Sequence, residues 1–157
     1  MALELTGKKI VLGVAGSIAA YKAADVASRL VGLGADVKVV LTQSGTRFIT
    51  PETFRAITGH TCLVGLFDEF EEGQIAHIAV IEQADLLLIA PATANILGKL
   101  AIGIADDLLT TLALAARCPV LIAPAMNSKM WSNPLVTENV EKLKKHGCQF
   151  IEPDEGR

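Results

Sequence analysis

The chain has 157 residues, a formal net charge of −3 and 51% hydrophobic residues. This length suits one domain, 1–157, that buries roughly two-thirds of the surface its unfolded chain would expose. Lysines and arginines are scattered rather than clustered, so nucleic acid and anionic membranes are not the expected partners, and a small-molecule ligand is the better expectation.

A membrane span is not expected either. The longest apolar stretch, 86–98, is interrupted by Pro91, Thr93 and Asn95, and it is shorter than the ~20 residues that a spanning helix needs. The three cysteines lie far apart and in no CxxC pair, which favours a reducing cytoplasm over a disulfide framework or a zinc site. The surplus of Ala, Val, Leu and Ile is typical of a sheet buried on both faces plus a subunit interface, so we expect a cytoplasmic oligomer.

The first strand-to-helix turn contains a glycine. Residues 9–14 have the pattern of a buried strand, and a helix is expected from Ser17, as its N-cap, to about Val31. Gly16 lets the backbone turn tightly, so that the first N–H groups of the helix can face an anion. An ordinary tight turn of an α/β protein explains the same glycine equally well.

A polar loop follows the second expected strand, 37–42. Its hydroxyl side chains, Thr42, Ser44 and Thr46, could bind the same anion, although they are also ordinary loop residues. Before the next long strand, the sequence predicts a helix over 51–57, a short strand over 63–67 and an exposed acidic turn over 68–73. His77 then follows among apolar neighbours, either as a core residue or, beside a pocket, as a general base.

Two further strands end in segments that could bind a ligand. Residues 86–90 lead into small residues over 91–96, where a flat ring could approach the backbone and where Thr93 and Asn95 offer hydrogen bonds. Residues 120–123 lead into 124–131, which holds the only Trp and two of the three Met. These large side chains either contact a planar aromatic ligand or cover the end of the sheet.

The remaining pattern completes the expected fold. Helices are predicted over 108–116, capped by Asp106 or Asp107, and from Asn133 to about Lys145, before a last strand over 148–151. Alternating strands and helices predict an α/β fold with a doubly wound parallel sheet, a Rossmann- or flavodoxin-like three-layer sandwich. All the ligand-competent segments follow strands, so they should meet at one edge of the sheet.

These segments together resemble the homo-oligomeric flavin-containing cysteine decarboxylases, and most closely their phosphopantothenoylcysteine decarboxylase branch in the bifunctional coenzyme A biosynthesis flavoproteins. The resemblance covers essentially the whole chain and rests on residues 16–22, on His77-Ile78, on a PASANT-like motif at 91–95, on Asp106-Asp107, and on a complete PxMNxxMW motif at 124–131.

The resemblance implies FMN at a subunit boundary of a homotrimer and no metal, and trimers of this family often assemble further into dodecamers. In this family the flavin oxidises the cysteine thiol side, CO2 leaves, and the hydride returns to give 4'-phosphopantetheine. The implied catalytic residues are His77, as acid/base, and Asn127, which holds the substrate carboxylate. The implied cofactor contacts are Gly16, Ser17, Ile18, Thr42, Ser44, Phe48, Pro91, Ala92, Thr93, Asn95, Ala125 and Met126.

Two alternatives stay open at this point: a peptidyl-cysteine decarboxylase and a non-catalytic FMN-binding regulatory subunit. The family's hydride return uses a lid cysteine just beyond the last strand, and the sequence reaches Arg157 without one. We therefore expect a chain truncated before that lid and before a fused phosphopantothenate-cysteine ligase domain.

Overall fold

Five parallel strands form the central sheet of the computed structural model, which describes the backbone of residues 4–67, 69–70 and 74–153, and the same side chains apart from 69–70 and 74–78. The strand order is β2-β1-β5-β6-β7. The strands are β1 (Lys9–Val14), β2 (Asp36–Leu41), β5 (Leu86–Ala92), β6 (Val120–Pro124) and β7 (Gln149–Phe150). The chain adds β2 on one side of β1 and the other strands on the other side, which confirms the doubly wound topology and puts its switch point between β1 and β5.

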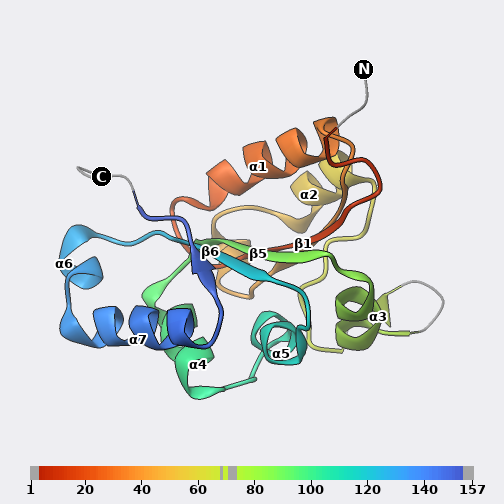
Figure 1. Ribbon diagram of the computed structural model, residues 1–157. Helices are drawn as coiled ribbons and strands as arrows, with labels where there is room; N and C mark the ends of the chain where they lie inside the picture. Colours follow the sequence, from red (N-terminus) through yellow and green to blue (C-terminus); the bar gives the residue numbers. More distant parts are fainter. Residues whose placement is uncertain (1–3, 68, 71–73, 154–157) are drawn as a thin grey trace.

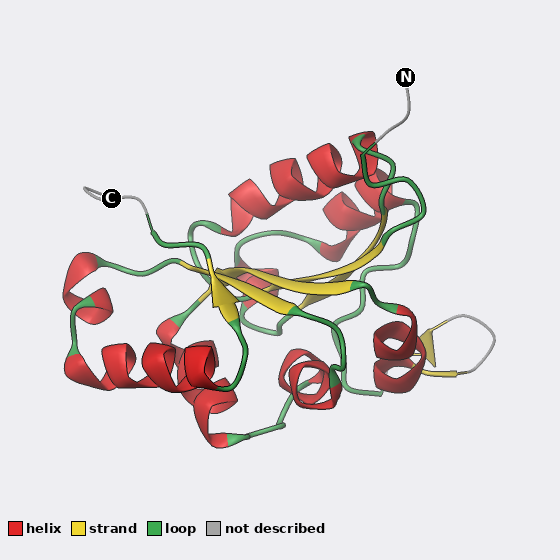
Figure 2. Ribbon diagram, in the orientation of Figure 1, coloured by secondary structure: helices red, strands yellow, loops and turns green. Residues whose placement is uncertain are grey.

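Helices cover both faces of this sheet, as Figures 1 and 2 show. One face carries α1 (Ala20–Gly32) and α2 (Pro51–Thr58), and the other carries α3 (Ala76–Gln83), α4 (Ala94–Ile102), α5 (Leu108–Ala115) and α7 (Pro134–Lys145). The short α6 (Ser128–Trp131) lies beyond the end of β6. Among the described helices, α1 and α2 alone cover the α1 face, and Leu121 and Ala123 of β6 stay half-buried on that side.

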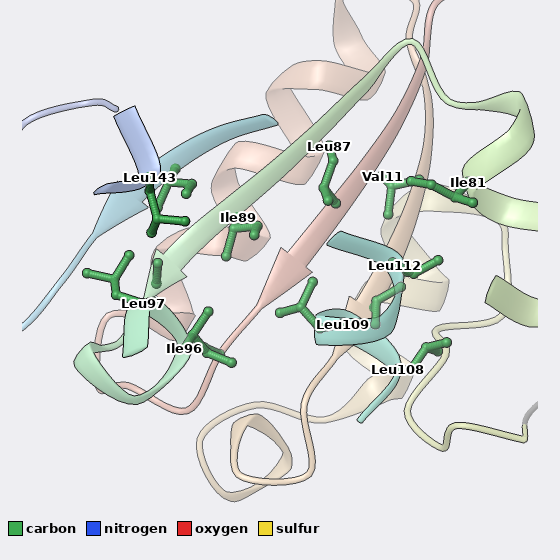
Figure 3. Close-up of a cluster of buried hydrophobic side chains, with 14 of the residues drawn as sticks. Val11, Ile81, Leu87, Ile89, Ile96, Leu97, Leu108, Leu109, Leu112 and Leu143 are labelled. Atoms are coloured by element: carbon green, nitrogen blue, oxygen red, sulfur yellow. The ribbon is translucent and has the colours of Figure 1, made fainter. Parts of the chain in front are cut away.

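The alternation of side chains along the strands divides the core in two. Val11, Leu87 and Ile89 face α4, α5 and α7, where they pack with Leu97 and Leu109 (Figure 3). On the α1 face, Leu12, Val14, Val39, Leu41 and Phe54 form the second cluster. A parallel sheet whose strands are apolar on both faces is what the runs of Val, Leu and Ile predict.

Helix ends confirm several of the predicted boundaries. Asp107 caps α5 by accepting the N–H of Thr110 at 2.8 Å, and Asn133 caps α7 by accepting the N–H of Leu135 at 2.9 Å. The expected cap of α1 is wrong in position: the helix begins at Ala20, and Ser17 instead accepts the N–H of Ala19 at 3.1 Å in the preceding turn.

The segment between α2 and α3 differs from the prediction. The expected strand over 63–67 is reduced to a single bridge between Leu63 and Val40, because only Leu63 reaches the edge of β2. Of the expected acidic turn, Glu69–Phe70 forms β3, which pairs with β4 (Gln74–Ile75). Residues 68 and 71–73 of that turn lie outside the described residues.

Candidate functional site

A groove of about 670 Å³ opens at the carboxyl ends of β5 and β6, on the α1 face of the sheet. This volume is within the range of small-molecule and cofactor sites. Six of the predicted residues line it: Ser17, Ile18, Pro91, Ala125, Met126 and Asn127. The structure therefore brings together the first βα turn and the segments after β5 and β6, as the sheet topology predicts.

Small side chains make the room in this groove. Ala19 and Ala23 line it from the start of α1, and Ala90, Ala123 and Ala125 line it from the strand ends. Because an alanine side chain stops at Cβ, these positions leave a smooth and mostly apolar wall. A flat apolar ring could lie against such a wall.

The turn after β1 is in close contact with the loop after β2. A Cβ atom added to Gly16 would lie 2.5 Å from Cβ of Ser44 and 2.9 Å from the Ser44 carbonyl carbon. No residue other than glycine fits here without moving the loop. The two predicted anion-binding segments are thus adjacent, and the N-terminal end of α1 directs its positive dipole toward them.

The buried side chain of Thr42 holds the loop over 43–48 in place. The Thr42 side chain is only 7% exposed, and its hydroxyl oxygen accepts the N–H of Gly45 at 3.0 Å. Ser44 is exposed beside Gly16, and Phe48 is also exposed. Thr42 is therefore placed to shape the loop, whereas Ser44 and Phe48 are available to a ligand.

Residues 91–95 connect three strand ends. The carbonyl oxygen of Pro91 accepts the N–H of Ala15 at 3.2 Å, and that of Ala92 accepts the N–H of Ala125 at 3.0 Å. The Ala92 side chain is fully buried, so this residue supports the groove instead of lining it. Thr93 caps α4 through the N–H of Ile96 at 3.2 Å, while Asn95 is exposed in the first turn of that helix.

Asn127 stands at the mouth of the groove with one half of its amide in use. Its side-chain oxygen accepts the backbone N–H of Met130 at 3.0 Å and so caps α6. The NH2 group of the same amide has no hydrogen-bond partner within the described chain. Asn127 can therefore donate hydrogen bonds to a ligand carboxylate without adding a positive charge.

The large side chains of this segment have divided roles. Met126 and Trp131 are half-buried and pack against the core, as expected if they cover the end of the sheet. Met126 also lines the groove, and Met130 is exposed. Met126 and Trp131 thus agree with the interpretation that they cover the end of the sheet, and Met126 also lies where a ligand in the groove would contact it.

His77, the second predicted catalytic residue, belongs to the first turn of α3. Figure 1 places α3 and α6 at opposite ends of the molecule. The His77 side chain lies outside the described residues. Helix α3 contains His77, and Asn127 caps the start of α6. Within one chain, these two helices are therefore well separated.

Tyr21, Lys22, Val26 and Pro153 also line the groove, although none of them was among the predicted site residues. Tyr21 and Lys22 belong to the segment 16–22 that carries the family resemblance. Lys22 and Val26 are one turn apart on α1, so the i, i+4 spacing could have revealed their shared face. Among the described residues that line the groove, Lys22 provides the charge, and its Nζ atom lies 6.0 Å from the centroid of the Tyr21 ring.

A family model described as Flavoprotein matches residues 2–157. The chain belongs to the Flavoprotein family. It is 49% identical over 152 residues to the coenzyme A biosynthesis bifunctional protein CoaBC of Bacillus subtilis, which covers 97% of the chain. It is 48% identical over 150 residues to CoaBC of Mycolicibacterium smegmatis, covering 96% of the chain. The chain spans only 37% and 36% of the lengths of these two relatives.

Solved structures of similar proteins have the same fold. The FMN-dependent cysteine decarboxylase SpaF superposes with a TM-score of 0.88 at 39% identity, over 99% of this chain and 88% of SpaF. A PPC decarboxylase mutant complexed with pantothenoylaminoethenethiol gives a TM-score of 0.82 at 30% identity, over 96% of this chain and 84% of the other. The three-layer α/β fold of a flavoprotein decarboxylase is confirmed. No helix of the described chain has the length and apolar character to cross a bilayer.

Proposed function

We propose that this chain binds FMN and decarboxylates 4'-phospho-N-pantothenoylcysteine toward 4'-phosphopantetheine, as a step of coenzyme A biosynthesis. The observation that carries this proposal is the position of Asn127, a neutral donor fixed by α6 at the mouth of an apolar groove. The similarity to CoaBC proteins and to a PPC decarboxylase complex supports the choice of reaction and substrate.

The residues present fit FMN. Gly16 lies in close contact with Ser44, so the turn after β1 and the loop after β2 are adjacent just before the start of α1, and a helix N-terminus suits a phosphate group. The alanine wall and Met126 suit an apolar ring system. Of the predicted contacts, Ser17, Ile18, Pro91, Ala125 and Met126 line the groove and would touch the cofactor there. Ser44, Phe48 and Asn95 are exposed outside the described lining and would contact it from the neighbouring loops. Thr42, Ala92 and Thr93 would support these segments.

The bound flavin would supply reversible two-electron oxidation at the substrate thiol, which creates the electron sink that CO2 loss requires. The chain's own residues would orient the substrate and move its protons. Asn127 would hold the carboxylate through its NH2 group. A neutral amide suits this task because an ion pair would stabilise the carboxylate charge in the ground state and so oppose CO2 loss. His77 would take the proton of the thiol.

We further propose that the active site combines residues of two chains in a homotrimer, which could assemble into a dodecamer. The separation of α3 and α6 within one chain supports this, because His77 of one copy would have to meet Asn127 of another. The half-buried α1 face of β6 also leaves apolar surface for a neighbouring copy to cover.

The span of the chain relative to CoaBC supports a fused ligase domain in the full-length protein, because the remaining two-thirds of those relatives lies outside the match. Residues 1–157 would then be the decarboxylase domain. All three cysteines lie within the described residues, and none of them forms a disulfide. This is in keeping with a cytoplasmic location.

A peptidyl-cysteine decarboxylase is the second candidate, because the structure of the peptidyl-cysteine decarboxylase EpiD is also similar to the chain. A direct comparison of substrates separates the two functions. Purified protein reconstituted with FMN is mixed with phosphopantothenoylcysteine or with a short peptide ending in cysteine, while flavin absorbance and CO2 are followed. We expect bleaching and CO2 release with the first substrate. Turnover of the peptide alone would replace the proposed substrate, and a protein that cannot be loaded with FMN would refute both functions.

A further inference from the structure

The groove of the candidate site has one charged side chain among its described lining residues, and the function proposed above does not use it. This residue is Lys22, in the first turn of α1. Its ammonium group forms no ion pair with any described residue, and its recorded contact is with the ring of Tyr21, which also lines the groove. A cation at an apolar groove without an anionic partner in the protein is suited to an anionic ligand.

The proposed substrate is anionic at both ends, with a carboxylate at the cysteine and a phosphate at the far end of the pantothenoyl arm. The carboxylate is assigned to Asn127, on the segment after β6. Lys22 lies on a different element, α1, whose exposed face continues along the groove to Val26, one turn later. Asn127 and Lys22 thus stand on separate walls of the groove, as an extended molecule with two anionic ends requires.

We propose that the ammonium group of Lys22 binds the phosphate of the substrate and makes this chain selective for phosphorylated substrates. The inference rests on the function proposed above and assigns the residue that recognises the far end of its substrate. Lysine binds a phosphate as a mobile point charge, so a side chain exposed at the rim can follow the end of a flexible arm.

Two other anions could use Lys22, and both make distinct predictions. If Lys22 bound the substrate carboxylate, its charge would stabilise the group that must be lost. Removing the lysine charge would then raise the KM of the phosphorylated and the unphosphorylated substrate alike. If it bound the cofactor phosphate, its removal would lower the FMN content of the purified protein. The function proposed above assigns the cofactor phosphate to the adjacent loops that meet at Gly16 and Ser44, beside the start of α1.

The test compares the wild type with Lys22→Met and Lys22→Arg, using phosphopantothenoylcysteine and its dephosphorylated analogue. In the wild type we expect a lower KM for the phosphorylated substrate. Lys22→Met should raise that KM about tenfold, the size of one charge-assisted hydrogen bond at an exposed site, and so bring the two KM values close together. Lys22→Arg should restore the preference. Lys129→Met is the matched control, since it removes the same charge from α6 at a residue outside the described lining of the groove.

A binding measurement keeps the inference testable apart from catalysis. Calorimetry on the FMN-loaded protein should show tighter binding of 4'-phosphopantetheine than of pantetheine to the wild type, and similar binding of both to Lys22→Met. Equal binding of both ligands to the wild type would overturn the proposal, as would loss of FMN from the Lys22→Met protein. If the wild type binds phosphopantetheine preferentially through Lys22 but releases no CO2 from any substrate, the proposed reaction fails while the assignment of Lys22 stands.

Discussion

The side-chain oxygen of Asn127 accepts the backbone N–H of Met130 at 3.0 Å, and this single hydrogen bond decides which end of the amide is left for a ligand. The cap fixes the side chain at the start of α6 and leaves the NH2 group as the donor. A carboxylate could form the same cap, because it also accepts hydrogen bonds from backbone N–H groups. The folding role and the proposed catalytic role of this residue can therefore be separated by substitution.

Replacing Asn127 with Asp should abolish CO2 release and leave the fold and the FMN content intact. The new carboxylate can still cap α6, but it repels the substrate carboxylate and cannot donate to it. We expect turnover to fall by at least about a hundredfold. Turnover is measured as CO2 release, and FMN content by absorbance. Ser128→Ala, at the next residue, is the control and should keep wild-type turnover. An Asn127→Asp protein with wild-type turnover would refute the role assigned to Asn127.

Replacing Gly16 with Ala should separate the first turn from the loop after β2. The added Cβ would lie 2.5 Å from Cβ of Ser44, so the loop must shift. We expect a loss of about 1–3 kcal/mol of stability and weaker FMN binding, measured by urea unfolding of the apoprotein and by flavin titration. Gly32→Ala is the control, because nothing lies within 4 Å of its added Cβ. Equal FMN affinity in both variants would show that this contact does not form the cofactor site.

Mixing two inactive variants tests whether the active site is shared between chains. His77→Asn and Asn127→Asp proteins are co-expressed, so that mixed oligomers form. If a site uses His77 of one copy and Asn127 of another, roughly a quarter of the sites should be intact on random mixing. CO2 release by the mixture is compared with that of each variant alone. Activity no higher than that of the separate variants would mean that both residues act within one chain.

The pairing of Asp36 with His60 should make part of the stability depend on pH. Nε2 of His60 lies 2.6 Å from Oδ1 of Asp36 and connects the start of β2 to the turn after α2. Burial raises the pKa of Asp36, but the hydrogen bond from His60 and the charge of Lys38 outweigh it, so the pKa lies below its usual value of 3.8. A lowered carboxyl pKa means that the contribution is complete above the unfolded-state pKa and is lost as pH falls through the folded-state pKa.

We therefore expect Asp36→Asn to lower the urea midpoint at pH 7. The difference from the wild type should shrink as the pH falls below the ordinary carboxyl pKa of 3.8 and disappear below the lower pKa of the folded state. Asp25→Asn is the control, because its pairing with Arg29 is on the exposed face of α1, where ion pairs contribute little. A difference that stays constant from pH 7 to pH 3 would show that the charge of Asp36 does not contribute.

The sequence by itself determined the order of the strands and helices and most of their boundaries. The apolar runs of β5 and β6 are local features of the sequence, and so are the helix caps Asp107 and Asn133. Their physical effect depends on neighbouring residues in the chain. The convergence of the segments after β1, β5 and β6 could also be predicted, because parallel strands end at one edge. The PxMNxxMW segment located Asn127 at that edge before any contact was known.

Only the tertiary structure decided which of the predicted residues are exposed to a ligand. Thr42 and Ala92 carry the right residue types, but packing against other strands buries them. Lys22 lines the groove because α1 covers only part of β6 on this face of the sheet. How much of β6 stays open depends on which helices pack against that face. The distance between α3 and α6 is likewise decided by how the layers pack. Sequence patterns report local periodicity, and they do not show how far apart two helices lie or which surfaces stay open after packing.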